Sequence, residues 1–175
     1  TFASAGLTSA TQSITPTAGA ATQLAVTTAA AGAASGAAFT TQPVVAVRDA
    51  AGNTRTTDNS TVVTMTVSAG ATTVGTVTAT ASSGVATFSN VGISGTAGTA
   101  YTLTFASAGL TSATQSITPT AGAATQLAVT TAAAGAVSGA AFTTQPHVTV
   151  RDAAGNTVTT SGATVTMTVS AGATV

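Results

Sequence analysis

A long internal repeat constrains this chain more than any other feature. Residues 1–33 return unchanged as residues 104–136, an offset of 103 residues, and the copies keep matching through Arg48 and Arg151 with few substitutions. Self-similarity at a fixed spacing is the sequence signature of a tandem array of structural units. A spacing near 100 residues is that of one ordinary domain with its own core. The chain therefore holds about 1.7 repeats rather than one large domain.

The repeat divides the chain into three parts. We expect residues 1–17 to be the C-terminal strands of a preceding repeat, 18–120 a complete repeat, and 121–175 the N-terminal part of a following repeat. The junction is the sequence Thr-Pro-Thr-Ala-Gly, which occurs at 15–19 and again at 118–122. Proline stiffens such a link, and it is too short for a flexible tether. Because the chain opens and closes within a repeat, we expect that its ends are not natural ones.

Alternating apolar and polar residues run through most of the repeat. In 61–68 (TVVTMTVS) the Val and Met residues share one face, and Tyr101, Leu103 and Phe105 do the same further on. This period of two is typical of half-buried strands, so the sequence predicts an all-β fold of tandem sandwiches. The Ala-rich segment 29–38 has no amphipathic stripe, and we expect an irregular connection there with one helical turn at most. Further strands are expected at 22–28, 43–48, 75–81, 84–89 and 111–118, between turn signals such as Gly52-Asn53 and Ser83-Gly84.

Differences between the two copies indicate which face of a strand is buried. Val44 and Ala46 become His147 and Thr149, whereas the valines that follow each of them persist. Polar residues are accepted only at alternate positions, so we expect Val44 and Ala46 to face solvent. The segment 58–60 is one residue shorter in the second copy, which indicates an exposed loop tip.

Charge is almost absent, and this excludes several functions. The chain has three Arg and three Asp, with no Lys, Glu or Cys. Nucleic-acid binding and attraction to an anionic membrane both need clustered Lys or Arg, so neither partner is expected. Without Cys there is no disulfide, thiol catalysis or thiolate metal site. Thr, Gly, Ser and Pro interrupt every 20-residue window, so we expect no membrane insertion by this segment.

The order of the segments resembles a known family. A strand ending in Asp-x-x-Gly-Asn (45–54, VAVRDAAGNT) precedes a Val/Thr strand (61–70) and then 82–107, SSGVATFSNVGISGTAGTAYTLTFAS. This series resembles the bacterial Ig-like domains of the invasin and intimin type over essentially the whole repeat. The resemblance implies immunoglobulin-like β-sandwiches that form rods on bacterial surface proteins, and therefore an extracellular location.

Few residues could carry chemistry. Asp49, Asn53 and Asp58 could suggest calcium, but calcium needs 6–8 oxygens, and Ser161 replaces Asp58 in the second copy. Hydrogen bonds that close a turn explain these residues better. His147 replaces a valine of the first copy, so we expect an exposed strand residue rather than a ligand or base. No Ser-His-Asp or paired-carboxylate constellation recurs, and we expect no enzyme, no cofactor and no metal site.

The Thr rows, the glycosylation signal and the aromatic residues each have a functional and a structural interpretation. Thr rows at 64–66 and 76–80 could bind ice, but a twisted sheet favours a solvated face. Residues 59–61 (Asn-Ser-Thr) fit an N-glycosylation signal on an exposed loop, which is mostly coincidence in a bacterial protein. Tyr101 is a candidate tyrosine corner and Phe88 a core anchor. Because all aromatics look buried, we expect no sugar-binding or receptor-binding platform.

The expected function is mechanical. The sequence indicates a structural repeat module, a stalk or spacer, of a large adhesin-like bacterial protein at the cell surface or secreted, with neighbouring repeats of the same chain as partners. The alternative is a building unit of a self-assembling extracellular filament or surface coat. Natural edge strands are usually guarded by Lys or other charges, and this chain has almost none and a net charge of zero. Lateral self-association therefore remains open.

Overall fold

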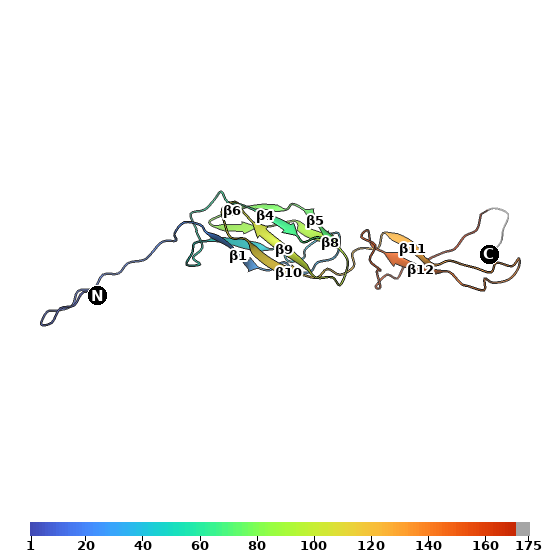
Figure 1. Cartoon of the computed structure of the whole chain (residues 1–175), viewed down its shortest axis with the longest axis horizontal. Helices are drawn as coiled ribbons and strands as arrows, with labels where there is room; N and C mark the ends of the chain where they lie inside the picture. Colours follow the sequence, from blue (N-terminus) through green and yellow to red (C-terminus); the bar gives the residue numbers. More distant parts are fainter. Residues whose placement is uncertain (171–175) are drawn as a thin grey trace.

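The computed structural model describes residues 1–170, and the secondary structure of this part consists of β-strands. The all-β prediction is confirmed. The described residues contain no helix long and apolar enough to cross a membrane. Residues 1–17 and the hairpin β11–β12 project from opposite ends of a strand-rich body, which is the complete repeat (Figure 1). The strands are β1 (Gln23–Thr28), β2 (Ala37–Ala38), β3 (Val44–Arg48), β4 (Val62–Val67), β5 (Ala71–Gly75), β6 (Thr78–Ser82), β7 (Val85–Thr87), β8 (Val91–Gly95), β9 (Tyr101–Ala106), β10 (Ala113–Ile117), β11 (Gln126–Thr131) and β12 (His147–Arg151).

The complete repeat is built around one seven-stranded antiparallel sheet that nearly closes into a barrel. Its order is β1-β3-β7-β6-β4-β9-β10, and a three-stranded sheet, β2-β8-β5, lies beside it. The outer strands β1 and β10 meet in parallel: the Leu24 N–H donates to the Thr111 carbonyl (2.9 Å), and the Thr111 N–H donates to the Thr22 carbonyl (2.9 Å). This contact joins the two edge strands of the large sheet where β1 and β10 begin.

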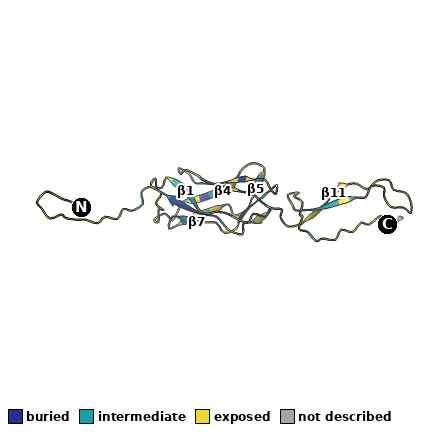
Figure 2. Cartoon of the chain, turned by 90° about the horizontal axis from the view of Figure 1, so that it is seen from below, coloured by how far each residue is buried: buried dark blue, intermediate teal, exposed yellow. Residues whose placement is uncertain are grey.

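The core forms where the alternating pattern predicts it. Met65 on β4 pairs with Phe105 on β9, and Tyr101, Leu103 and Phe105 are buried as expected. Phe88 packs against Phe105 with ring centroids 5.6 Å apart and the rings tilted by 59°, a favourable aromatic geometry. Phe88 is therefore the core anchor that the sequence predicts. The buried residues gather in the complete repeat, whereas the projecting ends are mostly exposed (Figure 2).

The turn between β6 and β7 lies where Ser83-Gly84 predicts it. The single strand predicted at 75–81 is instead divided between the end of β5 and most of β6. Ser83 (φ 50°) and Gly84 (φ 77°) both have positive φ, as a two-residue hairpin turn of type I′ requires. Residues 76–77 instead separate two strands, β5 in the small sheet and β6 in the large one. The pattern also missed β8, whose sequence VGISG carries two turn-favouring glycines. Its partners β2 and β5 decide that it is a strand.

The prediction that Ala46 faces solvent is wrong, because only 1% of its surface is exposed, while Val44 is half-buried. Ala46 lies between paired strands, and Arg48 is two residues further along the same face, where its long side chain can cover a small neighbour. The Arg48 Nε is buried and has no hydrogen-bond partner among the described residues. In the second copy, the equivalent guanidinium Nε of Arg151 donates to the Thr149 hydroxyl (3.2 Å).

The Ala-rich segment 29–38 is an irregular connection, as predicted, without a helical turn. Glutamine side chains satisfy backbone groups within this segment and just after it. The Ala30 N–H donates to Gln115 Oε1 (2.8 Å), and Gln115 Nε2 donates to the Ala30 carbonyl (2.6 Å). Gln42 likewise bridges the Phe39 and Val91 carbonyls and accepts the Val91 N–H. Neither glutamine lies in a sequence pattern that predicts this role.

The flanking copies repeat the local structure of the complete repeat without its burial. The β11–β12 pair has the same register and the same irregularity as β1–β3. Leu127 is 57% exposed, whereas its copy Leu24 is 5% exposed. Phe2 is 67% exposed and its copy Phe105 is buried, so the expectation that all aromatics are buried is wrong.

Candidate functional site

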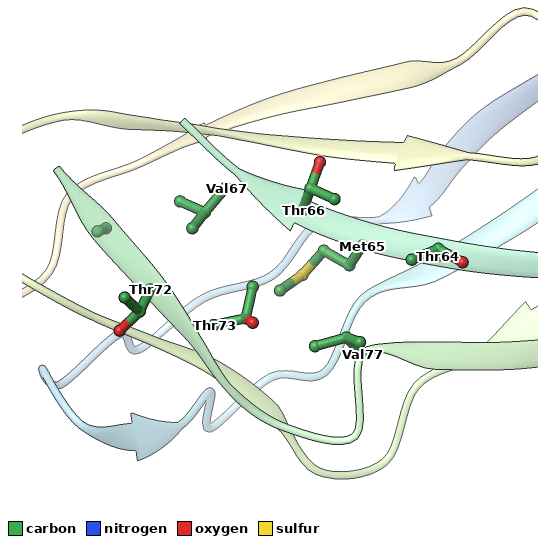
Figure 3. Close-up of a pocket in the computed structure, with 8 residues that line it drawn as sticks. Thr64, Met65, Thr66, Val67, Thr72, Thr73 and Val77 are labelled. Carbon is green, nitrogen blue, oxygen red and sulfur yellow. The ribbon is translucent and has the colours of Figure 1, made fainter. Parts of the chain in front are cut away.

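A surface hollow lies between β4 and β5, where the chain passes from the large sheet to the small one (Figure 3). It is shallow, with a volume of about 380 Å³. Hydroxyl and aliphatic groups line it, with the Met65 sulfur at its base, and no lining residue titrates or carries charge. Such a surface offers no general acid, base or nucleophile pair. The lining residues are Thr64, Met65, Thr66, Val67, Ala71, Thr72, Thr73 and Val77.

Asp49 closes the turn after β3, as the sequence predicts. Its Oδ1 accepts the N–H groups of Ala51 (3.0 Å) and Asn53 (2.8 Å), and its Oδ2 accepts Asn53 Nδ2 (3.0 Å) and the Gly19 N–H (2.9 Å). Gly52 supplies the positive φ that the turn needs. The Asn53 side-chain hydrogen bond, with those from Gly19 and the backbone of Asn53, lowers the pKa of Asp49 to about 2. The four donors favour the ionised form of this carboxylate.

The second copy builds the same turn from Asp152. Its Oδ1 accepts the N–H groups of Ala154 and Asn156, and its Oδ2 accepts Asn156 Nδ2 (2.8 Å) and the Gly122 N–H (2.8 Å). Burial opposes ionisation, but the hydrogen bonds from Asn156 and Gly122 outweigh it, and the pKa of Asp152 is lowered. Five residues of local sequence are therefore enough to specify this turn twice.

Asp58 is buried, at 9% exposure, although the sequence suggested an exposed loop tip. Its carboxylate accepts the Thr61 hydroxyl (2.7 Å) and the N–H groups of Ser60 and Thr61. The Thr61 hydrogen bond, partly opposed by burial, lowers the pKa of Asp58. In the second copy the Ser161 hydroxyl accepts the Ala163 N–H (3.3 Å). Serine thus keeps the turn and dispenses with the charge.

The other candidate residues lie apart from one another. His147 is exposed on β12. Thr64 lies beside Thr78, and Thr66 beside Thr104, across neighbouring strands. Residues 59–61 lie in the loop before β4. Within residues 1–170, no three His, Cys, Asp or Glu side chains gather as a metal-binding group.

Tyr101 is anchored as a tyrosine corner would be. Its hydroxyl accepts the Thr96 N–H (3.0 Å), five residues upstream, and donates to the Gly70 carbonyl (3.2 Å). The ring is 5% exposed. Tyr101 therefore ties the start of β9 to the loops at one end of the repeat.

Comparisons with known proteins concern the fold. No known family matches the sequence, and no curated protein matches it. A glycosyl hydrolase family 2 member from Bacteroides cellulosilyticus is structurally similar, with a TM-score of 0.44 and 14% identity over 58% of this chain and 14% of that chain. A second such structure, from strain DSM 14838, gives a TM-score of 0.44 and 15% identity over 58% of this chain and 15% of that chain. The likeness covers a small part of those longer proteins, and no activity is transferred from it.

Proposed function

We propose that this chain is part of a tandem array of immunoglobulin-like β-sandwiches that serves as a stalk or spacer of a large bacterial protein at the cell surface or secreted. One observation carries the proposal. The copies before and after the complete repeat leave it at opposite ends of its long axis (Figure 1). Repeats joined in this way add length with each copy, which is what a stalk requires. The resemblance to invasin-type and intimin-type domains supports the same reading.

The chemistry of the surface is consistent with a mechanical role. Charge is confined to three Arg and three Asp, and the three carboxylates are used in turns. The hollow between β4 and β5 is lined by hydroxyl, aliphatic and thioether groups. Hydroxyl side chains supply the polar surface that keeps an uncharged protein in water. We therefore propose no catalysis, cofactor or nucleic-acid partner for this segment.

A self-assembling filament or coat is the second candidate, and β5 favours it. This strand pairs with β8 on one side and lies at the edge of the small sheet. Its sequence, ATTVG, has no charge or proline to block pairing with another chain. The large sheet offers less, because β1 and β10 cover each other.

Electron microscopy of the native material distinguishes the two functions. Single beaded threads one domain wide are expected for a stalk. Ordered sheets or laterally joined filaments would overturn it in favour of the coat. The variant Thr72→Lys places a charge at an exposed position of β5 and should leave threads unchanged, but it should disperse an assembly that is built on this edge.

A further inference from the structure

The complete repeat contacts the following segment through one side-chain amide. Asn156 Oδ1 accepts the Ala97 N–H (2.8 Å), and Asn156 Nδ2 donates to the Gly95 carbonyl (2.9 Å). The same Nδ2 also donates to Asp152 Oδ2 (2.8 Å), which fixes the orientation of the amide. Asn156 thus belongs to its own turn and also forms hydrogen bonds with the Ala97 N–H and the Gly95 carbonyl of the repeat before it.

The surface that receives Asn156 is organised within the complete repeat. The Ser35 hydroxyl donates to the Gly95 carbonyl (2.9 Å) and accepts the Gly95 N–H (3.0 Å), and Ser35 is buried. The Ser35 N–H donates to the Thr120 carbonyl (3.0 Å), just before the next copy begins. We call Ser35, Gly95 and Ala97 the receiving end. Its groups are held in place by bonds that do not involve Asn156.

A glycine lets the two copies approach closely. A Cβ atom at Gly122 would overlap the Ser35 carbonyl oxygen, which belongs to the preceding repeat. The φ of Gly122 is not in the left-handed region, so an L-residue could adopt its backbone conformation. At the copy, Gly19, an added Cβ would meet only Asp49, at ordinary contact distances of 3.7 Å. The contact between copies, rather than the backbone, therefore requires glycine at position 122.

The turn at Asp152 is more buried than its copy at Asp49, as expected if it contacts the preceding repeat. Asp152 is 1% exposed and Asp49 is 6% exposed, while Asn156 is half-buried and Asn53 is exposed. The second turn is more buried although it belongs to the copy with the less complete core. The second turn is the one that contacts the receiving end, through Asn156 on Gly95 and Ala97.

We infer that residues 152–156 form an inter-repeat clasp, and that its partner is the receiving end of the preceding copy of the same repeat. Along the array, each turn of this kind would bind the end of the repeat before it and fix one orientation between successive sandwiches. The groups that join the copies are a neutral amide and backbone N–H and C=O groups. The clasp therefore needs no metal ion and no salt bridge. The clasp rests on the proposed tandem array. A stalk does not require the clasp, because an array with flexible joints between its repeats would also extend outward. An experiment can therefore contradict the clasp without contradicting the stalk.

Amide hydrogen exchange in the full chain tests the clasp. Ala97 should exchange slowly in the unaltered protein and roughly tenfold faster or more in Asn156→Ala, which removes its acceptor. Gly122→Ala should have the same effect by separating the copies. The matched controls are Asn53→Ala and Gly19→Ala, which alter the same sequence where the described contacts are to Asp49 of the same turn.

A distance measurement provides the second readout. The chain has no Cys, so spin labels at Thr80→Cys and Thr131→Cys report one distance between the repeat and the following hairpin. A narrow distribution is expected, broadened by Asn156→Ala or Gly122→Ala and unchanged by the two controls. Protection of the Leu103 amide shows that the core of each variant stays folded. Rapid Ala97 exchange in the unaltered chain, or equal effects of variants and controls, would overturn the clasp while leaving the stalk to be judged by microscopy.

Discussion

At the scale of single residues, the same residue in two copies of the repeat differs in burial. Phe105 is fully buried and Phe2, its copy, is 67% exposed. Asp49 and Asp152 make the same turn with the same donors, yet only the second turn meets a preceding repeat. The chain thus contains its own controls, because a substitution can be made in either copy with the same local sequence.

Truncation of Phe105 should unfold the repeat far more readily than truncation of Phe2. Phe105→Ala removes a buried ring that packs on Phe88, and it should lower the free energy of unfolding by about 3–5 kcal/mol. Phe2→Ala should change it by less than about 0.5 kcal/mol, as exposed substitutions do. His147→Val should also have almost no effect. Thermal melts of the three variants test this, and the reverse order would contradict the assignment of the core.

Acid should destabilise the repeat through Asp49. Its pKa falls from 3.8 to about 2 on folding, so the ionised carboxylate stabilises the fold above pH 3.8. That stabilisation is lost as the pH falls from about 4 to about 2. The melting temperature should fall over this window. In Asp49→Asn it should be lower at pH 7, and the gap to the unaltered protein should narrow at pH 2; a gap that does not depend on pH would contradict the role of the charge.

At the scale of elements, side chains supply the hydrogen bonds of backbone groups that no neighbouring strand pairs. The connection 29–38 has only a two-residue strand, and Gln115 supplies two hydrogen bonds to the Ala30 backbone. Gln42 does the same for Phe39 and Val91, just after the connection and at the start of β8. Buried backbone groups must find partners, and glutamine carries both a donor and an acceptor. This explains how a segment so rich in Ala and Gly can be ordered without a helix.

Removing Gln115 should loosen that connection. Gln115→Ala leaves the Ala30 N–H and carbonyl without their partners and should destabilise the repeat by about 1–3 kcal/mol. Gln12→Ala is the matched control, because Gln12 is the exposed copy of Gln115, and it should be neutral. Chemical denaturation of the two variants measures the difference. Equal effects would show that the glutamine side chain does not hold the connection.

At the scale of the whole molecule, the chain is extended, with successive copies joined end to end (Figure 1). Its stability comes from one packed core, a large sheet whose edge strands meet, and hydrogen-bonded turns. The Asp-x-x-Gly-Asn turns satisfy their carboxylates with N–H groups of the chain itself. Cohesion between copies, by the inferred clasp, uses uncharged groups.

Metal removal should therefore leave the protein unchanged. A chelator such as EDTA should not alter the melting temperature, because the Asp49 oxygens already accept four hydrogen bonds. A melt with chelator, followed by one with added calcium, measures this. A drop of several degrees that calcium reverses would restore calcium as a ligand of these turns.

The sequence by itself determined what depends on neighbours along the chain. The copy at 104–136 predicted the tandem units, the alternation in β4 and β9 predicted their buried faces, and Asp49 and Ser83-Gly84 predicted their turns. These features are local, since their hydrogen bonds or side-chain directions are set within a few residues. The sequence alone therefore predicts the fold class and the positions of these turns.

Only the tertiary structure decided what depends on distant partners. It made a strand of β8, buried Ala46 beneath its neighbours, closed β1 onto β10, and brought Asn156 to the backbone of Gly95 and Ala97. Such pairings are chosen by packing and hydrogen bonding summed over the whole domain, and a short window of sequence contains only one partner of each. For this reason the sequence pattern alone does not identify these partners.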